Sequence, residues 1–216
     1  MKTALIIFDL DGTLLHTLDD LADSSNFILR TYGFPEHPVE AYRFFVGDGI
    51  RKLIERIIPE DKREDFFIEK VKSEFMKYYE IHKYDKTAPY QGIIELLRTI
   101  QNKNIKIAVA SNKTHEVMEK MMEFYFPGIH FDAVFGQRKQ IPPKPDPVIV
   151  VDILHKTGIS KENTLYVGDT SVDMLTARNA GLKSIGVLWG FRSKEELLQA
   201  GADIIIEKPE ELLNYC

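Results

Sequence analysis

Two aspartates, Asp9 and Asp11, directly follow an apolar run and precede Gly12. The run, residues 3–8, is too short for a helix and rich in apolar side chains, which predicts a strand of a parallel sheet buried on both faces. Ligands of such sheets bind beyond the carboxyl ends of the strands. Neighbouring carboxylates repel each other unless a cation neutralises them, and Mg²⁺ commonly combines carboxylates with phosphate oxygens. The pair therefore indicates a metal-dependent phosphate site, although Asp-Gly is also an ordinary turn sequence.

A hydroxyl and an amide, Ser111 and Asn112, follow a second apolar run, residues 107–110. We expect the next helix to begin near Thr114. A hydroxyl beside a helix N-terminus can bind an anion, but the same residue types also cap helices. This segment by itself therefore allows both roles.

A single lysine, Lys144, stands among four prolines in residues 142–147. Proline fixes φ and removes a backbone donor, so this loop should be stiff and should aim the ammonium group of the lysine. The alternative is a solvated surface lysine in an ordinary connection. The sequence does not decide whether the Lys144–Pro145 peptide bond is cis or trans.

A second pair of acids, Asp169 and Asp173, follows the apolar run of residues 164–167. Asp173 falls in the first turn of the next predicted helix, where a carboxylate is favourable and can cap the backbone. Asp169 has no such structural role. Together with Asp9 and Asp11 it would complete an acidic cluster that is electrostatically unreasonable without a divalent cation, so we expect a Mg²⁺ site here.

The composition is that of an ordinary globular protein. The chain has 216 residues, 44% hydrophobic content and a formal net charge of −5, which gives no indication of nucleic-acid binding. Cys216 is the single cysteine, which excludes an internal disulfide framework and suits a reducing compartment. The apolar run near the N-terminus is too short for a signal peptide or a membrane span. We therefore expect a cytoplasmic protein without nucleic-acid or membrane partners.

Strand-like and helical segments alternate along much of the chain, which predicts an α/β fold with a doubly wound, Rossmann-like parallel sheet. The predicted strands are residues 3–8, 105–110, 131–135, 164–167 and 184–187. The predicted helices are residues 92–101, a segment from about residue 114, and residues 147–156, 172–179 and 194–199. Residues 16–83 lack a comparable strand pattern, and proline and glycine in residues 88–92 mark the return of the chain. We therefore expect a small all-helical domain, residues 16–83, inserted into a sheet domain of residues 1–15 and 84–216.

Taken together, these segments resemble the four motifs of the haloacid dehalogenase superfamily. The motif residues are Asp-Leu-Asp-Gly-Thr at 9–13, Ser111-Asn112, Lys144-Pro145 and the stretch from Gly168-Asp169 to Asp173. The resemblance covers essentially the whole chain. The helical insertion is similar to a type-1 cap, and residues 45–51, 186–191 and 195–197 resemble the phosphoglycolate phosphatase branch. The resemblance implies a catalytic core of residues 1–15 and 84–216 and a cap of residues 16–83.

The resemblance also implies catalytic roles for the motif residues. Asp9 would attack phosphorus and form an aspartyl phosphate, which splits one difficult hydrolysis into two easier transfers. Asp11 would protonate the leaving oxygen and later deprotonate the hydrolytic water. Ser111, Asn112 and Lys144 would bind the phosphoryl group and neutralise its oxygens.

The metal ligands that the resemblance implies for Mg²⁺ are the Asp9 carboxylate, the Asp11 backbone carbonyl and Asp169. Asp173 would lie nearby and orient a bound water. One departure from the family pattern is His16, which stands where relatives usually carry an acid. The nucleophile and metal assignments do not depend on this position.

The inserted helical domain should select the substrate. Gly49 and Arg51 lie in a glycine-containing turn that opens a helix, where backbone donors and a cation could bind a small anion and close over it. The alternative for Arg51 is a solvated helix residue. The aromatic residues of the next segment are predicted to form the core of this domain: Phe66, Phe67, Phe75, Tyr78 and Tyr79.

The function that these observations favour is hydrolysis of a small phosphorylated metabolite, with 2-phosphoglycolate implied by the branch resemblance. A pyrophosphatase, a broad sugar-phosphate phosphatase and a β-phosphoglucomutase-like phosphotransferase could share all four motifs. A signalling receiver domain also combines acids, Mg²⁺, a hydroxyl and a lysine, but the long insertion and the acid two residues after the nucleophile argue against it. The sequence allows a monomer or a homodimer.

Overall fold

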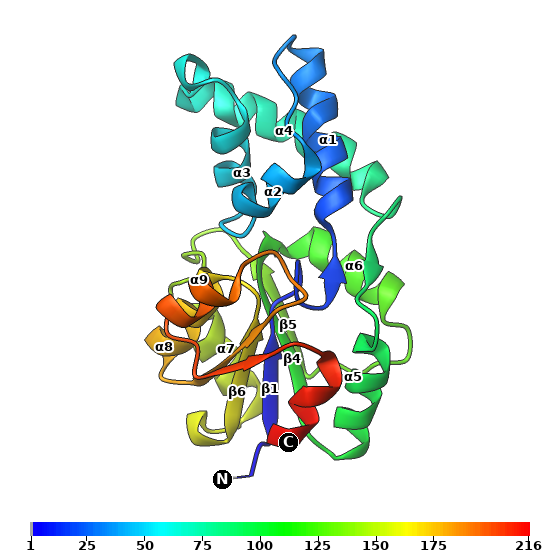
Figure 1. Ribbon diagram of the computed structural model, residues 1–216, viewed down its shortest axis with the longest axis vertical. Coiled ribbons are helices and arrows are strands. Elements are labelled where there is room, and N and C mark those ends of the chain that lie inside the picture. The colour runs from blue at the N-terminus through cyan, green and yellow to red at the C-terminus, as the bar shows by residue number, and fades with distance from the viewer. Residues whose placement is uncertain (1) are drawn as a thin grey trace. The chain divides into compact units, whose positions relative to one another are not determined.

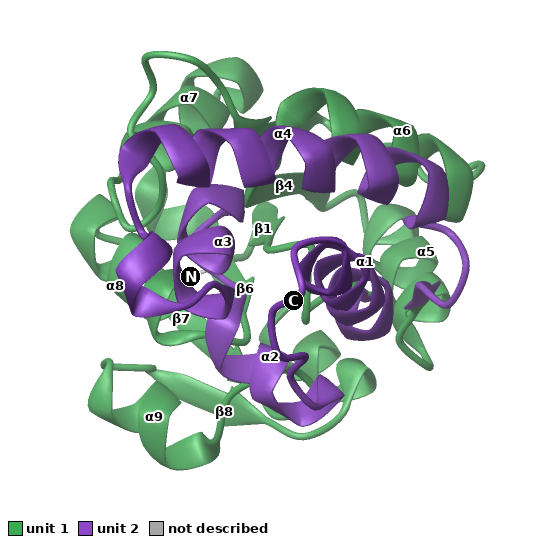
Figure 2. Ribbon diagram, turned by 90° about the horizontal axis from the view of Figure 1, so that it is seen from above, with its two compact units in different colours: residues 1–15, 89–216 green, residues 16–88 purple. Residues whose placement is uncertain are grey.

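The computed structural model describes residues 2–216, and these residues form two compact units (Figure 2). Unit 1 contains the chain up to Leu15 together with Pro89–Cys216, and unit 2 is His16–Ala88. The chain therefore returns to unit 1 between Ala88 and Pro89, beyond the predicted limit at residue 83. The physical reason is a contact inside unit 2: the buried carboxylate of Asp20 accepts hydrogen bonds from the backbone N–H groups of Lys86 and Thr87, both at 2.9 Å.

Within the described residues, the main sheet of unit 1 has six strands in the order β5-β4-β1-β6-β7-β8, and neighbouring strands are parallel. Their bounds are β1 (Leu5–Phe8), β4 (Lys106–Thr114), β5 (Ala133–Gln137), β6 (Thr164–Gly168), β7 (Lys183–Val187) and β8 (Ile204–Ile206). The sheet confirms the predicted α/β class. The edge strand β8 was not predicted, because three residues are too few to show a pattern.

Helices cover both faces of this sheet. Their bounds are α5 (Ile93–Asn102), α6 (His115–Tyr125), α7 (Val148–Thr157), α8 (Ser171–Ala180) and α9 (Lys194–Gln199), with 3₁₀ turns η2 (Lys161–Asn163) and η3 (Pro209–Tyr215). Figure 1 shows α5 and α6 on one side of the strands and α7 and α8 on the other. This is the doubly wound arrangement expected from the alternation of strands and helices.

The residues of β1 alternate between the two faces, as they must in a strand. Leu5 and Ile7 belong to the same core cluster as Ile149 and Ile153 of α7 and Ala177 of α8. The side chains between them point to the opposite face, so the whole strand is buried and reads as a continuous apolar run. Strand β1 ends at Phe8, and the first polar side chain after it is that of Asp9.

Unit 2 consists of helices and a 3₁₀ turn. Their bounds are α1 (Leu18–Thr31), α2 (Val39–Phe45), α3 (Ile50–Ile57), η1 (Glu60–Lys62) and α4 (Asp65–His82). The Tyr42 hydroxyl donates to Asn26 Oδ1 at 2.7 Å, which joins α2 to α1. Phe75 and Tyr79 are fully buried as predicted, but Phe66 is 82% exposed and was wrongly assigned to the core. Helical periodicity predicts a stripe of apolar residues, and Phe66 in the first turn of α4 lies off that stripe.

Two short strands, β2 (Leu15–His16) and β3 (Ala88–Pro89), pair where the chain crosses between the units. His16 Nδ1 lies 3.3 Å from Asp19 Oδ2, so this unusual residue is next to an acid from the first turn of α1. Among residues 2–216, no helix has the length and apolar character needed to cross a membrane.

Candidate active site

The carboxyl ends of neighbouring strands bring acidic side chains together in unit 1. Because β1 pairs with β6, Asp9 and Asp169 follow adjacent strands, and Asp173 joins them from the first turn of α8. Each carboxylate has an oxygen within 4.8 Å of an oxygen of the other two, and all are buried. We call Asp9, Asp169 and Asp173 the buried carboxylate cluster.

Lys144 enters this cluster from the proline-rich loop before α7. Its Nζ donates to Asp173 Oδ1 at 2.7 Å and lies 2.9 Å from Asp9 Oδ1. The side chain is 2% exposed, so the alternative of a solvated surface lysine is wrong. The Lys144–Pro145 peptide bond is cis.

The backbone and the ammonium of Lys144 are both held in place. Asn112 Oδ1 accepts from the Lys144 N–H at 2.8 Å, and Asn112 Nδ2 donates to the Lys144 carbonyl at 3.2 Å. The ammonium also donates to the Ala110 carbonyl at 3.0 Å and to the Tyr166 hydroxyl at 3.2 Å. Lys144 is thus oriented by contacts with β4 and β6 as well as by its stiff loop.

Burial dominates the electrostatics of the cluster. It raises the pKa of Asp9 to about 7, against the lowering effect of Lys144, and Asp173 and Asp11 raise it further. Burial also raises the pKa of Asp169 well above its usual range, and the charges of Asp173 and Asp9 add to this. For Lys144, burial lowers the pKa, but the Asp173 and Asp9 carboxylates outweigh it and raise the pKa well above the ordinary value. The site therefore carries more negative charge than its lysine neutralises.

A divalent cation fits this donor set. Carboxylate oxygens are the preferred ligands of hard cations, and the ammonium of Lys144 contacts two of the three buried carboxylates. Buried carboxylates are costly unless a positive charge lies beside them, so the cluster is suited to a further cation. The arrangement can hold that cation beside Asp9.

Asp169 is held by residues from two other segments. Its Oδ1 accepts from the Thr13 hydroxyl at 2.8 Å, and its Oδ2 accepts from the Phe191 N–H at 2.9 Å. A Cβ on Gly12, whose φ is +87°, or on Gly190 would come within 2.2 Å of Asp169 atoms. These glycines therefore make room for the carboxylate. The segment after β7 was not assigned to the site from the sequence, because residues 188–191 are Leu, Trp, Gly and Phe and the contact with Asp169 is made by a backbone N–H.

Asp173 has a structural role as well as a place in the cluster. Its Oδ2 accepts from the backbone N–H of Thr170 at 3.1 Å and from the Thr170 hydroxyl at 2.7 Å, which closes a capping box at the start of α8. Its other oxygen faces Lys144. Asp173 therefore both caps α8 and belongs to the acidic cluster, the two roles that the sequence suggested for it.

Ser111 and Asn112 do not cap a helix. Helix α6 begins at His115, its N-cap position is Thr114, and both polar residues lie inside the longer strand β4. Asn112 binds the backbone of Lys144, and the Ser111 hydroxyl accepts the N–H of Lys113 at 3.2 Å. The capping interpretation of these two residues is therefore wrong.

The carboxylate of Asp11 points to a partner outside the buried carboxylate cluster. Lys113 Nζ lies 3.0 Å from Asp11 Oδ1 and 3.3 Å from Oδ2. The lysine side chain is 3% exposed and that of the aspartate 20%. Sequence reasoning assigned no role to Lys113, although it follows Ser111 and Asn112 directly.

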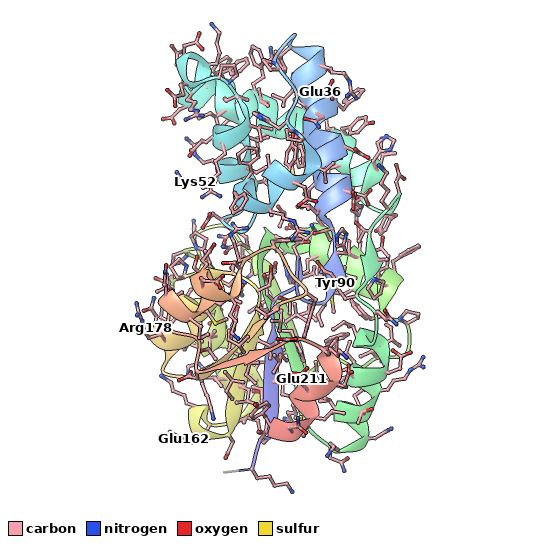
Figure 3. All side chains as sticks on the ribbon, viewed as in Figure 1. Glu36, Lys52, Tyr90, Glu162, Arg178 and Glu211 are labelled. Carbon is pink, nitrogen blue, oxygen red and sulfur yellow. The ribbon has the colours of Figure 1, made fainter. Side chains whose placement is uncertain are left out.

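Gly49 and Arg51 belong to unit 2. Gly49 occupies the N-cap position of α3 with φ +85°. The Arg51 guanidinium forms ion pairs with Glu69 at 2.7 Å, with Glu55 at 3.1 Å and with Asp65. We call Arg51 and these three acids the exposed charge cluster, because the arginine side chain is 40% exposed. Lys52, the next residue of α3, points away from the helices (Figure 3) and pairs with Glu55 at 2.6 Å.

Comparison with protein families gives one match that spans most of the chain. The family described as haloacid dehalogenase-like hydrolase matches residues 6–187. Those residues include Asp9, Ser111, Lys144, Asp169 and Asp173, so the family match covers the charged residues of this site.

Similar proteins cover nearly the full length. A phosphoglycolate phosphatase of Aquifex aeolicus is 30% identical over 97% of this chain and 94% of its own length. A phosphoglycolate phosphatase of Agrobacterium fabrum is 31% identical over 94% of this chain and 88% of its own. The crystal structure of a proposed phosphoglycolate phosphatase from Lactobacillus delbrueckii subsp. bulgaricus superimposes with a TM-score of 0.92, at 32% identity, over 98% of this chain and 97% of that one.

Proposed function

The chain belongs to the haloacid dehalogenase-like hydrolases, and on this premise we propose that it is a Mg²⁺-dependent phosphatase of small phosphomonoesters, with 2-phosphoglycolate as its substrate. The observation that carries the proposal is the contact of Lys144 with Asp9 inside the buried carboxylate cluster, at the carboxyl edge of the sheet. A buried nucleophile, a fixed ammonium and a set of hard oxygen ligands are the parts that phosphoryl transfer requires.

Asp9 is the nucleophile in this proposal. A carboxylate oxygen attacks phosphorus, the bond from phosphorus to the ester oxygen breaks, and an aspartyl phosphate forms on Asp9; water then cleaves it to release inorganic phosphate. Lys144, anchored by Asp173 and Tyr166, holds its charge where the phosphoryl oxygens gather.

Mg²⁺ would be held by Asp9, Asp169 and the Asp11 backbone carbonyl, with Asp173 beside it, and when bound it would neutralise the phosphoryl oxygens. Thr13, Phe191 and the space left by Gly12 and Gly190 fix Asp169 before any ligand arrives. Such preorganisation avoids a reorganisation cost during the reaction. Ser111 and Asn112 complete the phosphate site. The Ser111 hydroxyl would donate to a phosphoryl oxygen of the substrate, and the Asn112 side-chain amide keeps the backbone of Lys144 in place.

Asp11 is the general acid and base. It lies two residues after the nucleophile and is partly exposed, so it can reach a leaving group that arrives from solvent. A proton passes from Asp11 to the ester oxygen as the P–O bond breaks, and Asp11 later takes a proton from the attacking water. The poor leaving groups of alkyl phosphates need this proton.

Unit 2 serves as the cap, so that residues 16–88 select the substrate and residues 2–15 and 89–216 carry the chemistry. Gly49 occupies the N-cap position of α3, where the first backbone N–H groups of a helix have no partner within the helix and can bind an anion. The ion pairs of Arg51 with Glu55 and Glu69 support a role for this residue in the stability of the cap helices rather than in substrate binding. The substrate itself is supported by the relatives named phosphoglycolate phosphatase over nearly the whole chain.

The test is phosphate release from 2-phosphoglycolate, pyrophosphate, β-glucose 1-phosphate and p-nitrophenyl phosphate, with Mg²⁺ or EDTA, by the wild type and Asp9→Asn. We expect kcat/KM to be highest for 2-phosphoglycolate and activity to disappear in EDTA and in the variant. Similar low rates on all esters would replace the substrate assignment with a broad phosphatase. Transfer of phosphate between positions of glucose phosphate without release would replace hydrolysis with a mutase reaction.

A further inference from the structure

Lys113 is a buried cation whose ammonium reaches a residue of the proposed mechanism, yet no motif of the sequence analysis includes it. It lies near the end of β4, and its Nζ is within 3.3 Å of both oxygens of Asp11. The two residues are far apart in the chain and meet because β4 and β1 are neighbours in the sheet. The contact therefore depends on the fold and holds the Asp11 carboxylate at two points.

Stability alone does not explain this ion pair. Removing a lysine side chain from water costs several kcal/mol, and a buried pair is often no more stabilising than apolar side chains of the same size. The pairing of β4 with β5 is irregular between Ala110 and Thr114, the segment that contains Lys113. Irregularities of this kind commonly redirect side chains next to active sites.

The two aspartates of the first motif each have their own lysine. Lys144 lies 2.9 Å from Asp9 Oδ1, and Lys113 lies 3.0 Å from Asp11 Oδ1. Each lysine thus has an acid to orient, although only two sequence positions separate the acids. Asp9 must face the phosphorus atom and Asp11 the leaving oxygen, so the separate partners keep two like-charged groups in different directions.

We propose that Lys113 is a positioning residue for Asp11: it fixes the carboxylate in the orientation from which a proton passes to the leaving oxygen. This inference rests on the proposed phosphatase function. One Asp11 oxygen carries the proton and gives it to the ester oxygen as the P–O bond breaks, while the ammonium holds the other oxygen. Lys113 acts through Asp11 and forms no bond in the reaction.

The experiment compares two leaving groups. The alcohol of an alkyl phosphate such as 2-phosphoglycolate needs a proton to leave, whereas p-nitrophenolate leaves without one. We expect Lys113→Met to lower kcat/KM for 2-phosphoglycolate ~30-fold and for p-nitrophenyl phosphate by no more than ~3-fold, because general acid catalysis contributes ~10²–10⁴-fold to the step in which the leaving group departs. This constant does not include the later hydrolysis of the aspartyl phosphate, which both substrates share. Lys113→Arg, which can hold a carboxylate at two points, should recover much of the loss. Lys106→Met is the matched control: it removes a lysine from the other end of β4 that binds the Thr157 carbonyl, and it should leave both rates unchanged.

A double-mutant cycle with Asp11→Asn separates action through Asp11 from general damage. In the Asp11→Asn background, Lys113→Met should lower kcat/KM for 2-phosphoglycolate by less than ~2-fold, since coupled residues show non-additive effects. Equal losses on both substrates, or an undiminished loss in the Asp11→Asn background, would overturn the proposal. If Lys113→Met does not fold, Lys113→Gln, which keeps a polar side chain but carries no charge, provides the same comparison, with a loss confined to the alkyl phosphate. Activity that survives Asp9→Asn would instead overturn the proposed function.

Discussion

The buried carboxylate cluster of unit 1 and the exposed charge cluster of unit 2 contain similar side chains in different surroundings. In the first, Lys144 is 2% exposed and contacts Asp9 and Asp173. In the second, Arg51 is 40% exposed and contacts Glu55, Asp65 and Glu69. Both consist of one basic side chain and the acids that the fold brings to it. Their chemistry differs because one is removed from water.

The pKa shifts of the acids run in opposite directions. Burial raises the pKa of Asp9 to about 7 despite the nearby lysine. In unit 2, a hydrogen bond from Lys52 lowers the pKa of Glu55, and hydrogen bonds from Lys72 and then Arg51 lower that of Glu69. Solvent keeps the exposed acids ionised at little cost, so they serve as surface ion pairs. The buried acids carry negative charge that Lys144 does not fully neutralise, and this uncompensated charge makes their site suited to cation binding and catalysis.

The largest effect should follow from removing the ammonium group of Lys144 from the buried carboxylate cluster. Lys144→Met leaves Asp9 and Asp173 without their ammonium, so we expect kcat to fall ~10³-fold, the scale of losing one preorganised electrostatic group. The free energy of unfolding should fall by about 3 kcal/mol, because an acid is left buried without its partner. Phosphate release and urea unfolding measure the two effects. A kcat within ~10-fold of the wild type would contradict the role of Lys144 in neutralising the phosphoryl group.

The second prediction concerns the response of the buried cluster to metal. Saturating Mg²⁺ should raise the Tm of the wild type by ~5 °C, since a ligand at a hundred times its Kd contributes about 2.7 kcal/mol. Asp169→Asn removes a charged ligand and should abolish this shift. Thermal unfolding with and without Mg²⁺ measures it within each variant, so any change in basal stability cancels. A shift that persists in Asp169→Asn would place the binding of Mg²⁺ elsewhere.

A smaller effect is expected from the residue that orients Lys144. Tyr166→Phe keeps the ring and removes the hydroxyl, which lies 3.2 Å from Lys144 Nζ and 3.3 Å from Asp173 Oδ1. The loss of one such hydrogen bond, about 1 kcal/mol, should lower kcat ~5-fold and leave KM nearly unchanged. Steady-state kinetics on 2-phosphoglycolate with Mg²⁺ measures both constants. An effect on KM alone would argue against a role in orienting Lys144.

The smallest effect should come from the cation of the exposed cluster. Arg51→Gln removes ion pairs that solvent screens, so the free energy of unfolding should change by about 0.5 kcal/mol and kcat/KM by less than ~2-fold. The same variant tests the sequence-based prediction that Arg51 binds the substrate. A rise in KM of ~10-fold or more would restore that prediction and would show that substrate competes with the acids for the guanidinium.

Much of the fold could be predicted because its signals are local. A buried parallel strand is a short apolar run, and residues 5–8 and 164–168 lie within or close to the predicted strands. The family resemblance rested on the residues at the ends of such strands, and the family match confirms it. The strand β8 and the exposed position of Phe66 were missed, since three residues show no periodicity and a helix pattern does not fix how each end packs.

The sequence by itself determined which residues could do chemistry, because polar side chains after apolar runs must lie at the carboxyl edge of a parallel sheet. Tertiary structure alone decided their partners. Lys113 meets Asp11, and Phe191 meets Asp169, only because the strands that precede these residues become neighbours in the sheet. It also decided that Lys144 is buried and Arg51 exposed. Charge and spacing are properties of the chain, but the desolvation that gives a charge its reactivity depends on what the fold packs around it.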